Sequence, residues 1–154
     1  MCYIWKNPTD PREEVSLETL SKLPGGFDNL NVSGGEPTLR TDLHEIIDIV
    51  YPKARITEIS SNGLHPERLV PIIKKYPNIK IRFSLEGDEV TNNSIRGEQN
   101  GYEIKIAGLR QLQEAGGTVS TLSGGEWQLP TRELIGSNGE IHDYPADSRE
   151  SQGH

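Results

Sequence analysis

Apolar positions recur along residues 15–116 in two alternating patterns. Stripes at helical spacing predict helices in "SLETLSKLP", "TDLHEIIDIVYP", "HPERLVPIIKKYP" and "GYEIKIAGLRQLQEAGG". Short runs between them predict strands in "FDNLNVS", "RITEISS" and "IKIRFSL". Strands that alternate with helices at this spacing build β–α units, so the sequence predicts an α/β fold with a mainly parallel sheet.

Polar residues and prolines mark where these helices should begin. Ser16 is suited to cap the first helix, and Thr41 to cap the second, where Glu45 stands in the position that completes a capping box. Pro66 should open the third helix, and Pro71 should bend or interrupt it. The fourth helix ends at a glycine pair, as helices commonly do.

The character of the chain changes near residue 117. "TVSTLS" can add one weak strand, but no sustained period follows, and the last dozen residues are almost wholly polar. We therefore expect two parts: a partial α/β core domain over residues 1–116, and a polar tail over residues 117–154 that is loosely ordered or disordered.

Composition narrows the function classes. Of 154 residues only 32% are hydrophobic, and the formal net charge is −7 without any lysine or arginine cluster, which argues against nucleic acid and anionic membranes as partners. One cysteine excludes an intrachain disulfide. No membrane-length apolar run and no signal peptide is visible. We therefore expect a soluble, cytoplasmic protein.

The segment "NLNVSGGEPTLRTDL" carries the clearest candidate chemistry. Gly34 and Gly35 follow a predicted strand and leave the backbone open to a ligand at the carboxyl end of a parallel sheet, where ligands of α/β folds bind. Glu36 beside exposed carbonyls favours a cationic group such as an ammonium over a phosphate, and Pro37 stiffens the loop. An ordinary strand-to-helix loop that uses glycine for its geometry explains the segment about equally well.

Polar side chains also follow the next two predicted strands. They comprise Ser60, Ser61 and Asn62 after one strand, and Ser84 and Glu86 after the next. Arg96 could lie over the same edge and bind a carboxylate through its planar guanidinium. Each has a plainer explanation, since an Asn-Gly pair favours a turn and a loop arginine is usually solvated. Their placement after successive strands is what favours a shared site.

The sequence does not support a zinc site, a serine-hydrolase site or a Walker-type phosphate loop. The four histidines show no metal-ligand spacing, and the chain has no G-x-S-x-G or Walker-type motif. A lone cysteine is more often inert packing than a ligand. The ordered motifs themselves point to one family.

Four short motifs occur in an order that resembles the radical S-adenosylmethionine (radical SAM) family. They are Gly34–Pro37 as G-G-E-P, Ser61–Gly63 as S-N-G, Ser84–Gly87 as S-L-E-G, and Ile95–Gly97 as I-R-G. The opening "MC" also matches the end of the family's C-x-x-x-C-x-Φ-C loop, with Met1 at Φ and Cys2 as its third cysteine. The resemblance covers residues 1 to about 116 and is specific as an ordered set. The first two cysteines and the first strand are absent, so we expect a chain that starts inside the gene.

The resemblance implies a partial parallel (β/α) barrel and a set of ligand roles. Cys2 would be one thiolate ligand of a 4Fe-4S cluster, and Met1 would pack near the adenine of S-adenosylmethionine. S-adenosylmethionine would lie across all three strand ends. Its ammonium would be held by Gly34, Gly35, Glu36 and Pro37, and its carboxylate by Ser84 and Arg96, while its ribose or methionine side would face Ser61 and Asn62. In the family, the reduced cluster splits the sulfonium of S-adenosylmethionine and yields a 5′-deoxyadenosyl radical. The protein supplies binding and orientation.

The expected function is therefore that of a radical SAM enzyme fragment with an unidentified substrate. Because such clusters need nearly complete cysteine ligation, we expect this polypeptide to be inactive alone, unless a second chain supplies the missing elements. One alternative is a non-catalytic remnant that binds S-adenosylmethionine or a partner. The other is a sugar- or phosphate-binding α/β barrel, which the charge of Glu36 disfavours.

Overall fold

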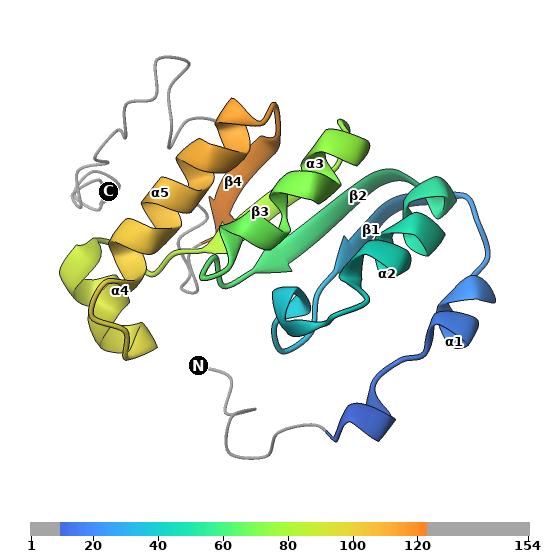
Figure 1. The fold of residues 1–154 in the computed structure, drawn as a ribbon, viewed down its shortest axis with the longest axis horizontal. Helices are drawn as coiled ribbons and strands as arrows, with labels where there is room; N and C mark the ends of the chain where they lie inside the picture. The colour runs from blue at the N-terminus through green and yellow to red at the C-terminus, as the bar shows by residue number, and fades with distance from the viewer. Residues whose placement is uncertain (1–9, 123–154) are drawn as a thin grey trace, which may run out of the picture.

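The computed structural model describes residues 10–122, and their centre is a four-stranded parallel sheet (Figure 1). The strands lie side by side in chain order: β1 (Phe27–Val32), β2 (Ala54–Ser61), β3 (Lys80–Ser84) and β4 (Thr118–Leu122). In the register of these strands, Ile59 of β2 lies opposite Val32 of β1 and opposite Ile81 of β3. All carboxyl ends therefore meet at one edge, and the predicted α/β fold with a partial parallel barrel is confirmed.

Helices alternate with these strands. They are α1 (Leu17–Ser21), α2 (Leu43–Val50), α3 (Val70–Lys75), α4 (Glu89–Arg96) and α5 (Gly101–Glu114). Short 3₁₀ turns also occur, at Pro11–Glu13, Pro37–Leu39, Tyr51–Lys53 and Pro66–Arg68. Figure 1 shows α2, α3 and α5 along one face of the sheet, with α4 beyond the carboxyl end of β3.

The core lies between these helices and that face of the sheet. Eight of its side chains are fully buried: Ile47, Ile59, Leu69, Ile72, Ile79, Ile81, Phe83 and Leu112. Each such side chain contributes roughly 1.5–3 kcal/mol when it leaves water. Most strand residues that alternate with the core are polar, and Arg82 of β3 pairs with Glu58 of β2 at 2.7 Å.

The predicted helix starts are partly right. Ser16 caps α1, since its Oγ accepts a hydrogen bond from the Thr19 amide at 3.1 Å. The prediction for α2 is wrong: Asp42, not Thr41, precedes the helix, and neither a side-chain cap nor a capping box with Glu45 forms there. The reason is that Asp42 binds a different partner.

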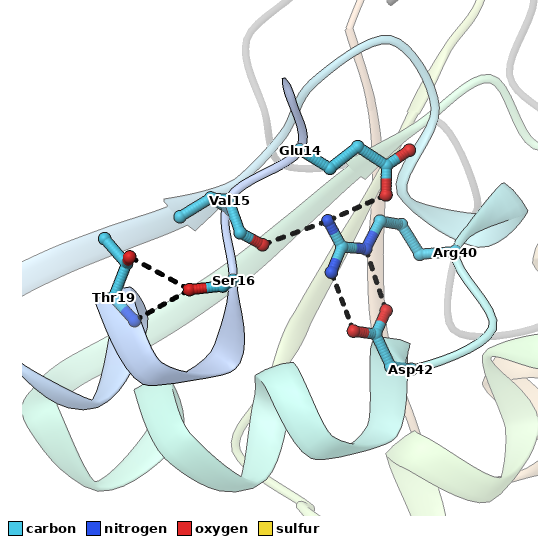
Figure 2. A network of polar contacts seen from close by, with 6 residues as sticks. All are labelled: Glu14, Val15, Ser16, Thr19, Arg40 and Asp42. Atoms are coloured by element: carbon cyan, nitrogen blue, oxygen red, sulfur yellow. Dashed lines mark hydrogen bonds and ion pairs between the residues drawn. The ribbon is translucent and has the colours of Figure 1, made fainter. Parts of the chain in front are cut away.

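That partner is Arg40, which connects α2 to the chain before α1 (Figure 2). Its Nε and Nη2 donate to the two carboxylate oxygens of Asp42 at 2.8 and 2.7 Å, which lowers the pKa of that carboxyl group. Its Nη1 donates to the Val15 carbonyl at 3.2 Å and lies 3.0 Å from a carboxylate oxygen of Glu14. Arg40 thus anchors the segment that leads into α1.

Helix α4 was not predicted. Its start is marked by Asp88, whose carboxylate accepts from the Thr91 amide at 2.8 Å, and its end by Gly97 with a φ of 69°. Arg96 therefore stands in the last turn of a helix and not in a loop. Pro71, in contrast, behaves as predicted: a 3₁₀ turn precedes it, and α3 begins separately at Val70.

The sheet continues past residue 116, because β4 pairs with β3 as the weak strand expected in "TVSTLS". The character of residues 123–154 lies outside the described part of the chain, so the division at residue 117 stays a prediction. Within residues 10–122, none of the helices has the length and apolar character needed to span a membrane.

Candidate functional site

Glu36 connects the ends of the first two strands. Its Oε1 accepts hydrogen bonds from the Thr38 amide at 3.0 Å, the Thr38 hydroxyl at 2.6 Å and the Ser61 hydroxyl at 2.9 Å. Its Oε2 accepts from the Asn62 amide at 2.6 Å. We call Glu36, Thr38, Ser61 and Asn62 the glutamate cluster.

The glutamate cluster is a pre-organised anionic site. Thr38 and Ser61 are buried, so their hydroxyl groups depend on Glu36 for a partner. A carboxylate offers about four lone-pair positions, and Oε2 uses one of its two here. The cluster can therefore receive one further donor at Oε2 without losing a bond it already makes.

The loop after β2 is fixed by its own side chains. The Asn62 Oδ1 accepts from the Leu64 amide at 2.9 Å, and the Ser61 Oγ accepts from the Gly63 amide at 3.0 Å. Gly63 has a φ of 77°, and a Cβ built there would lie 2.7 Å from a ring atom of Phe83. Asn62 and Gly63 thus form the turn that an Asn-Gly pair favours. Asn62 is also the residue predicted to face the ligand.

The loop after β1 leaves its backbone accessible. Gly34 and Gly35 are exposed, and a Cβ built on Gly34 would meet no atom within 4 Å. Pro37 is buried and begins the 3₁₀ turn that Glu36 caps. The two glycines therefore present backbone groups beside the glutamate cluster.

A second polar group forms at the end of β3. The Arg96 Nη2 donates to the Glu86 Oε1 at 2.5 Å, and the side chains of Arg96 and Glu86 are 31% and 15% exposed. Arg96 thus reaches from α4 to the loop that follows Ser84. A guanidinium held in this way keeps a planar fork that suits a carboxylate.

Sequence reasoning missed one residue here, Lys105 of α5. Its side chain is buried, and its Nζ donates to the Ser84 carbonyl at 3.0 Å and to the Asn92 Oδ1 at 2.9 Å. Burial is the main cause that lowers the pKa of Lys105 to about 8; the charge of Arg96 adds to this shift and Glu86 opposes it. We call Ser84, Glu86, Asn92, Arg96 and Lys105 the lysine cluster.

The structure brings the predicted residues together in these two clusters. Glu36, Ser61 and Asn62 belong to one, and Ser84 and Arg96 belong to the other. The two clusters meet through Gly63, since a Cβ there would also lie 3.1 Å from the Lys105 Cγ. Met1 and Cys2 lie outside the described residues. Within residues 10–122, no three His, Cys, Asp or Glu side chains form a group that could hold a metal ion.

Together the fold and the site define a parallel α/β domain with polar side chains gathered at the carboxyl edge of its sheet, and comparison with known families makes the class specific. The model of the radical SAM superfamily matches residues 1–125, so the chain belongs to that superfamily. Members of the superfamily use a 4Fe-4S cluster and S-adenosylmethionine as cosubstrate.

Curated relatives agree with this assignment. The chain is 34% identical over 87 residues to the Fe-coproporphyrin III synthase of Methanosarcina barkeri, covering 54% of this chain and 21% of the relative. It is 28% identical over 130 residues to the mycofactocin maturase MftC of Mycolicibacterium smegmatis, covering 79% and 32%. It is 25% identical over 120 residues to the sporulation killing factor maturation protein SkfB of Bacillus subtilis, covering 74% and 29%. The chain thus matches no more than a third of the length of any of these three.

Proposed function

We propose that the carboxyl edge of this sheet binds the methionine part of S-adenosylmethionine, with the ammonium at the glutamate cluster. The observation that carries the proposal is the geometry of Glu36. Four hydrogen bonds hold its carboxylate in place, and Oε2 retains room for one more donor. The exposed backbone of Gly34 and Gly35, with Pro37 holding the loop, supplies further acceptors for an ammonium.

The carboxylate of the ligand is assigned to Ser84 and Arg96. The guanidinium of Arg96 can bind a carboxylate by two parallel hydrogen bonds, and Ser84 ends the neighbouring strand. Ser61 and Asn62 lie between the two charged groups in strand order and are assigned to the ribose or methionine side. The roles of Met1 near the adenine and of Cys2 at the cluster rest on the family alone.

The donor set of this chain does not fit a 4Fe-4S cluster. The sequence contains one cysteine, whereas the family's cluster loop provides three. No radical step therefore follows from the residues present, and we expect the polypeptide alone to bind S-adenosylmethionine without cleaving it reductively. Anaerobic reconstitution should give substoichiometric, labile iron. Retention should improve when an added first strand and C-x-x-x-C complete the loop at Met1 and Cys2, and Cys2→Ala should abolish that gain.

We propose no chemical class of substrate for this chain. Two of the relatives are named for the maturation of other products, mycofactocin and sporulation killing factor, and one as a synthase of Fe-coproporphyrin III. The proposal is therefore restricted to the cosubstrate that the superfamily has in common.

Isothermal titration calorimetry with S-adenosylmethionine tests the proposal. Glu36→Gln should weaken binding by about tenfold or more, because the variant loses a charge-assisted bond to the ammonium. Glu45→Gln, on the exposed side of α2, serves as the matched control and should bind like the wild type. Binding of a sugar phosphate in place of S-adenosylmethionine would contradict the proposal and favour the alternative barrel.

A further inference from the structure

Lys105 occupies a position that packing alone would give to an apolar side chain. The buried face of α5 consists of Gly101, Lys105, Ile106, Gly108, Leu109 and Leu112. The lysine side chain is only 1% exposed. Burial of an ammonium costs free energy unless hydrogen bonds compensate, and the fall in its pKa to about 8 has the same origin.

The two hydrogen bonds of Lys105 reach two elements of the proposed carboxylate site, the end of β3 and helix α4. One acceptor is the carbonyl of Ser84, the last residue of β3. The other is the Oδ1 of Asn92, a fully buried residue of α4 that also lies 3.4 Å from the Glu86 amide. The lysine therefore joins the strand end, the loop after it and the helix that carries Arg96.

Asn92 extends this connection along α4. Its side-chain Nδ2 donates to the Asn93 Oδ1 at 3.2 Å, and the same oxygen accepts from the Tyr102 backbone amide at 2.8 Å. The Asn93 side-chain nitrogen in turn donates to the Gln99 carbonyl at 2.7 Å. Helix α4 is thus held against α5 at both the lysine and the asparagine pair, and the orientation of Arg96 depends on that attachment.

We propose that Lys105 is a positioning residue for the carboxylate of S-adenosylmethionine, acting through Ser84 and Arg96. This inference rests on the proposed function. Lys105 does not touch the ligand itself; it sets the distance between the end of β3 and the last turn of α4, and hence the spacing of the two groups assigned to the carboxylate. Loss of its two hydrogen bonds should weaken binding of the amino-acid part of the ligand and leave the adenosine part unaffected.

Lys105→Met separates positioning from stability, because methionine fills a similar volume and leaves no buried ammonium. The full chain should retain or gain thermal stability. Its affinity for S-adenosylmethionine should fall by about tenfold, while its affinity for 5′-methylthioadenosine, which lacks the amino-acid part, should stay at the wild-type value. Arg96→Met should show the same selectivity, and the double variant should lose little more than either single variant, since both act on one interaction.

Four other outcomes overturn the inference. Equal loss of both ligands together with lower stability would assign Lys105 a structural role, and unchanged affinity for both would assign it no role at the site. If the wild type binds 5′-methylthioadenosine as tightly as S-adenosylmethionine, the amino-acid part adds no affinity. The carboxylate site is then absent, although the nucleoside part still binds. If the wild type binds neither ligand, the proposed function itself fails, and this result differs from all the others.

A measurement on the wild type keeps the inference testable if Lys105→Met does not fold. In a chain with isotope-labelled lysine, the side-chain resonance of Lys105 should shift when S-adenosylmethionine binds, because the ligand changes the position of Ser84 and α4. 5′-Methylthioadenosine should leave that resonance in place. The exposed Lys74 of α3 provides the internal reference. Identical responses of Lys105 to the two ligands would contradict the proposal.

Discussion

The glutamate cluster and the lysine cluster hold neighbouring loops of the same sheet edge by different means. Glu36 belongs to the loop it fixes, and its partners Thr38, Ser61 and Asn62 lie on that loop or at the end of the adjacent strand. Lys105 reaches the end of β3 from a helix, 21 residues further along the chain. The first arrangement joins two strand ends through a partly exposed carboxylate, whereas the second depends on a buried charge and on the docking of two helices.

The difference indicates how each half of the site should respond to change. Removal of Glu36 leaves several buried donors without a partner, so stability and binding should fall together. Removal of the Lys105 charge takes away a desolvation cost, so stability and binding should separate. The following predictions test that contrast in order of expected effect.

Glu36→Leu should reduce the free energy of unfolding by about 3 kcal/mol, because the Thr38 and Ser61 hydroxyl groups and the Asn62 amide lose their acceptor. Denaturant unfolding measures the change. Glu45→Leu, an exposed substitution on α2, should change stability by less than about 0.5 kcal/mol. Similar losses in the two variants would remove the basis for calling the glutamate cluster a structural unit.

The stability difference between the wild type and Lys105→Met should depend on pH. The pKa of Lys105 is about 8 in the folded state and has its ordinary value of 10.5 in the unfolded state, so below pH 8 both states hold the proton and the burial cost opposes folding in full. Between these values the unfolded state binds more protons, and stability rises with pH. Between pH 7 and pH 10.5 the free energy of unfolding of the wild type should therefore rise by about 2–3 kcal/mol relative to that of the variant.

Chemical denaturation of both proteins across this pH range provides the measurement, and titrations common to the two cancel in the difference. Arg96 and Glu86 are the charged groups that act on Lys105, and both remain in the variant. A difference that stays constant with pH, or one that moves in favour of the variant as pH rises, would show that Lys105 is not buried as a charged group.

Arg40→Met should cost about 1 kcal/mol, because it removes the paired hydrogen bonds to Asp42 and the contact with the Val15 carbonyl. The segment before α1 should then become easier to cleave in limited proteolysis, while the glutamate cluster stays intact. The control Arg55→Met removes an exposed ion pair with Asp28 and should have almost no effect. Protection equal to that of the wild type would show that other contacts anchor this segment.

Arg96→Met should have the smallest effect on stability, about 0.5 kcal/mol, because it removes one ion pair at a partly exposed position. Thermal unfolding measures it, with the exposed Arg110→Met of α5 as the matched control. A loss as large as that of Glu36→Leu would mean that Arg96 holds the fold of the β3 loop instead of serving a ligand.

The sequence predicts most of the fold because local patterns and tertiary packing agree there. The alternation of stripes and short runs places the first three strands and four of the helices, and Ser16 caps α1 as expected. Thr41 fails as a cap because the conformation at the start of α2 is decided by the pairing of Asp42 with Arg40, a contact that propensity does not include.

The sequence predicts only the half of the site that short motifs mark, at the ends of β1 and β2. The order of G-G-E-P and S-N-G places Glu36 beside Ser61 and Asn62, and the structure joins them directly. Helix α4 has no apolar stripe to announce it, and its signals were the single cap residues Asp88 and Gly97. Lys105 was missed because lysine is seldom buried and because its partner Asn92 lies on that unpredicted helix.

An amide-resolved NMR titration of the labelled chain with S-adenosylmethionine tests the central claim most directly. The amide signals of Gly34, Gly35, Asn62 and Glu86 should shift together and give one dissociation constant, since all four lie at the carboxyl edge of the sheet. Those of Phe27, Ala54 and Lys80, which begin β1, β2 and β3, should stay in place. Shifts confined to these amino-terminal strand ends, or none at all at saturating ligand, would contradict the assignment of the carboxyl edge as the binding site.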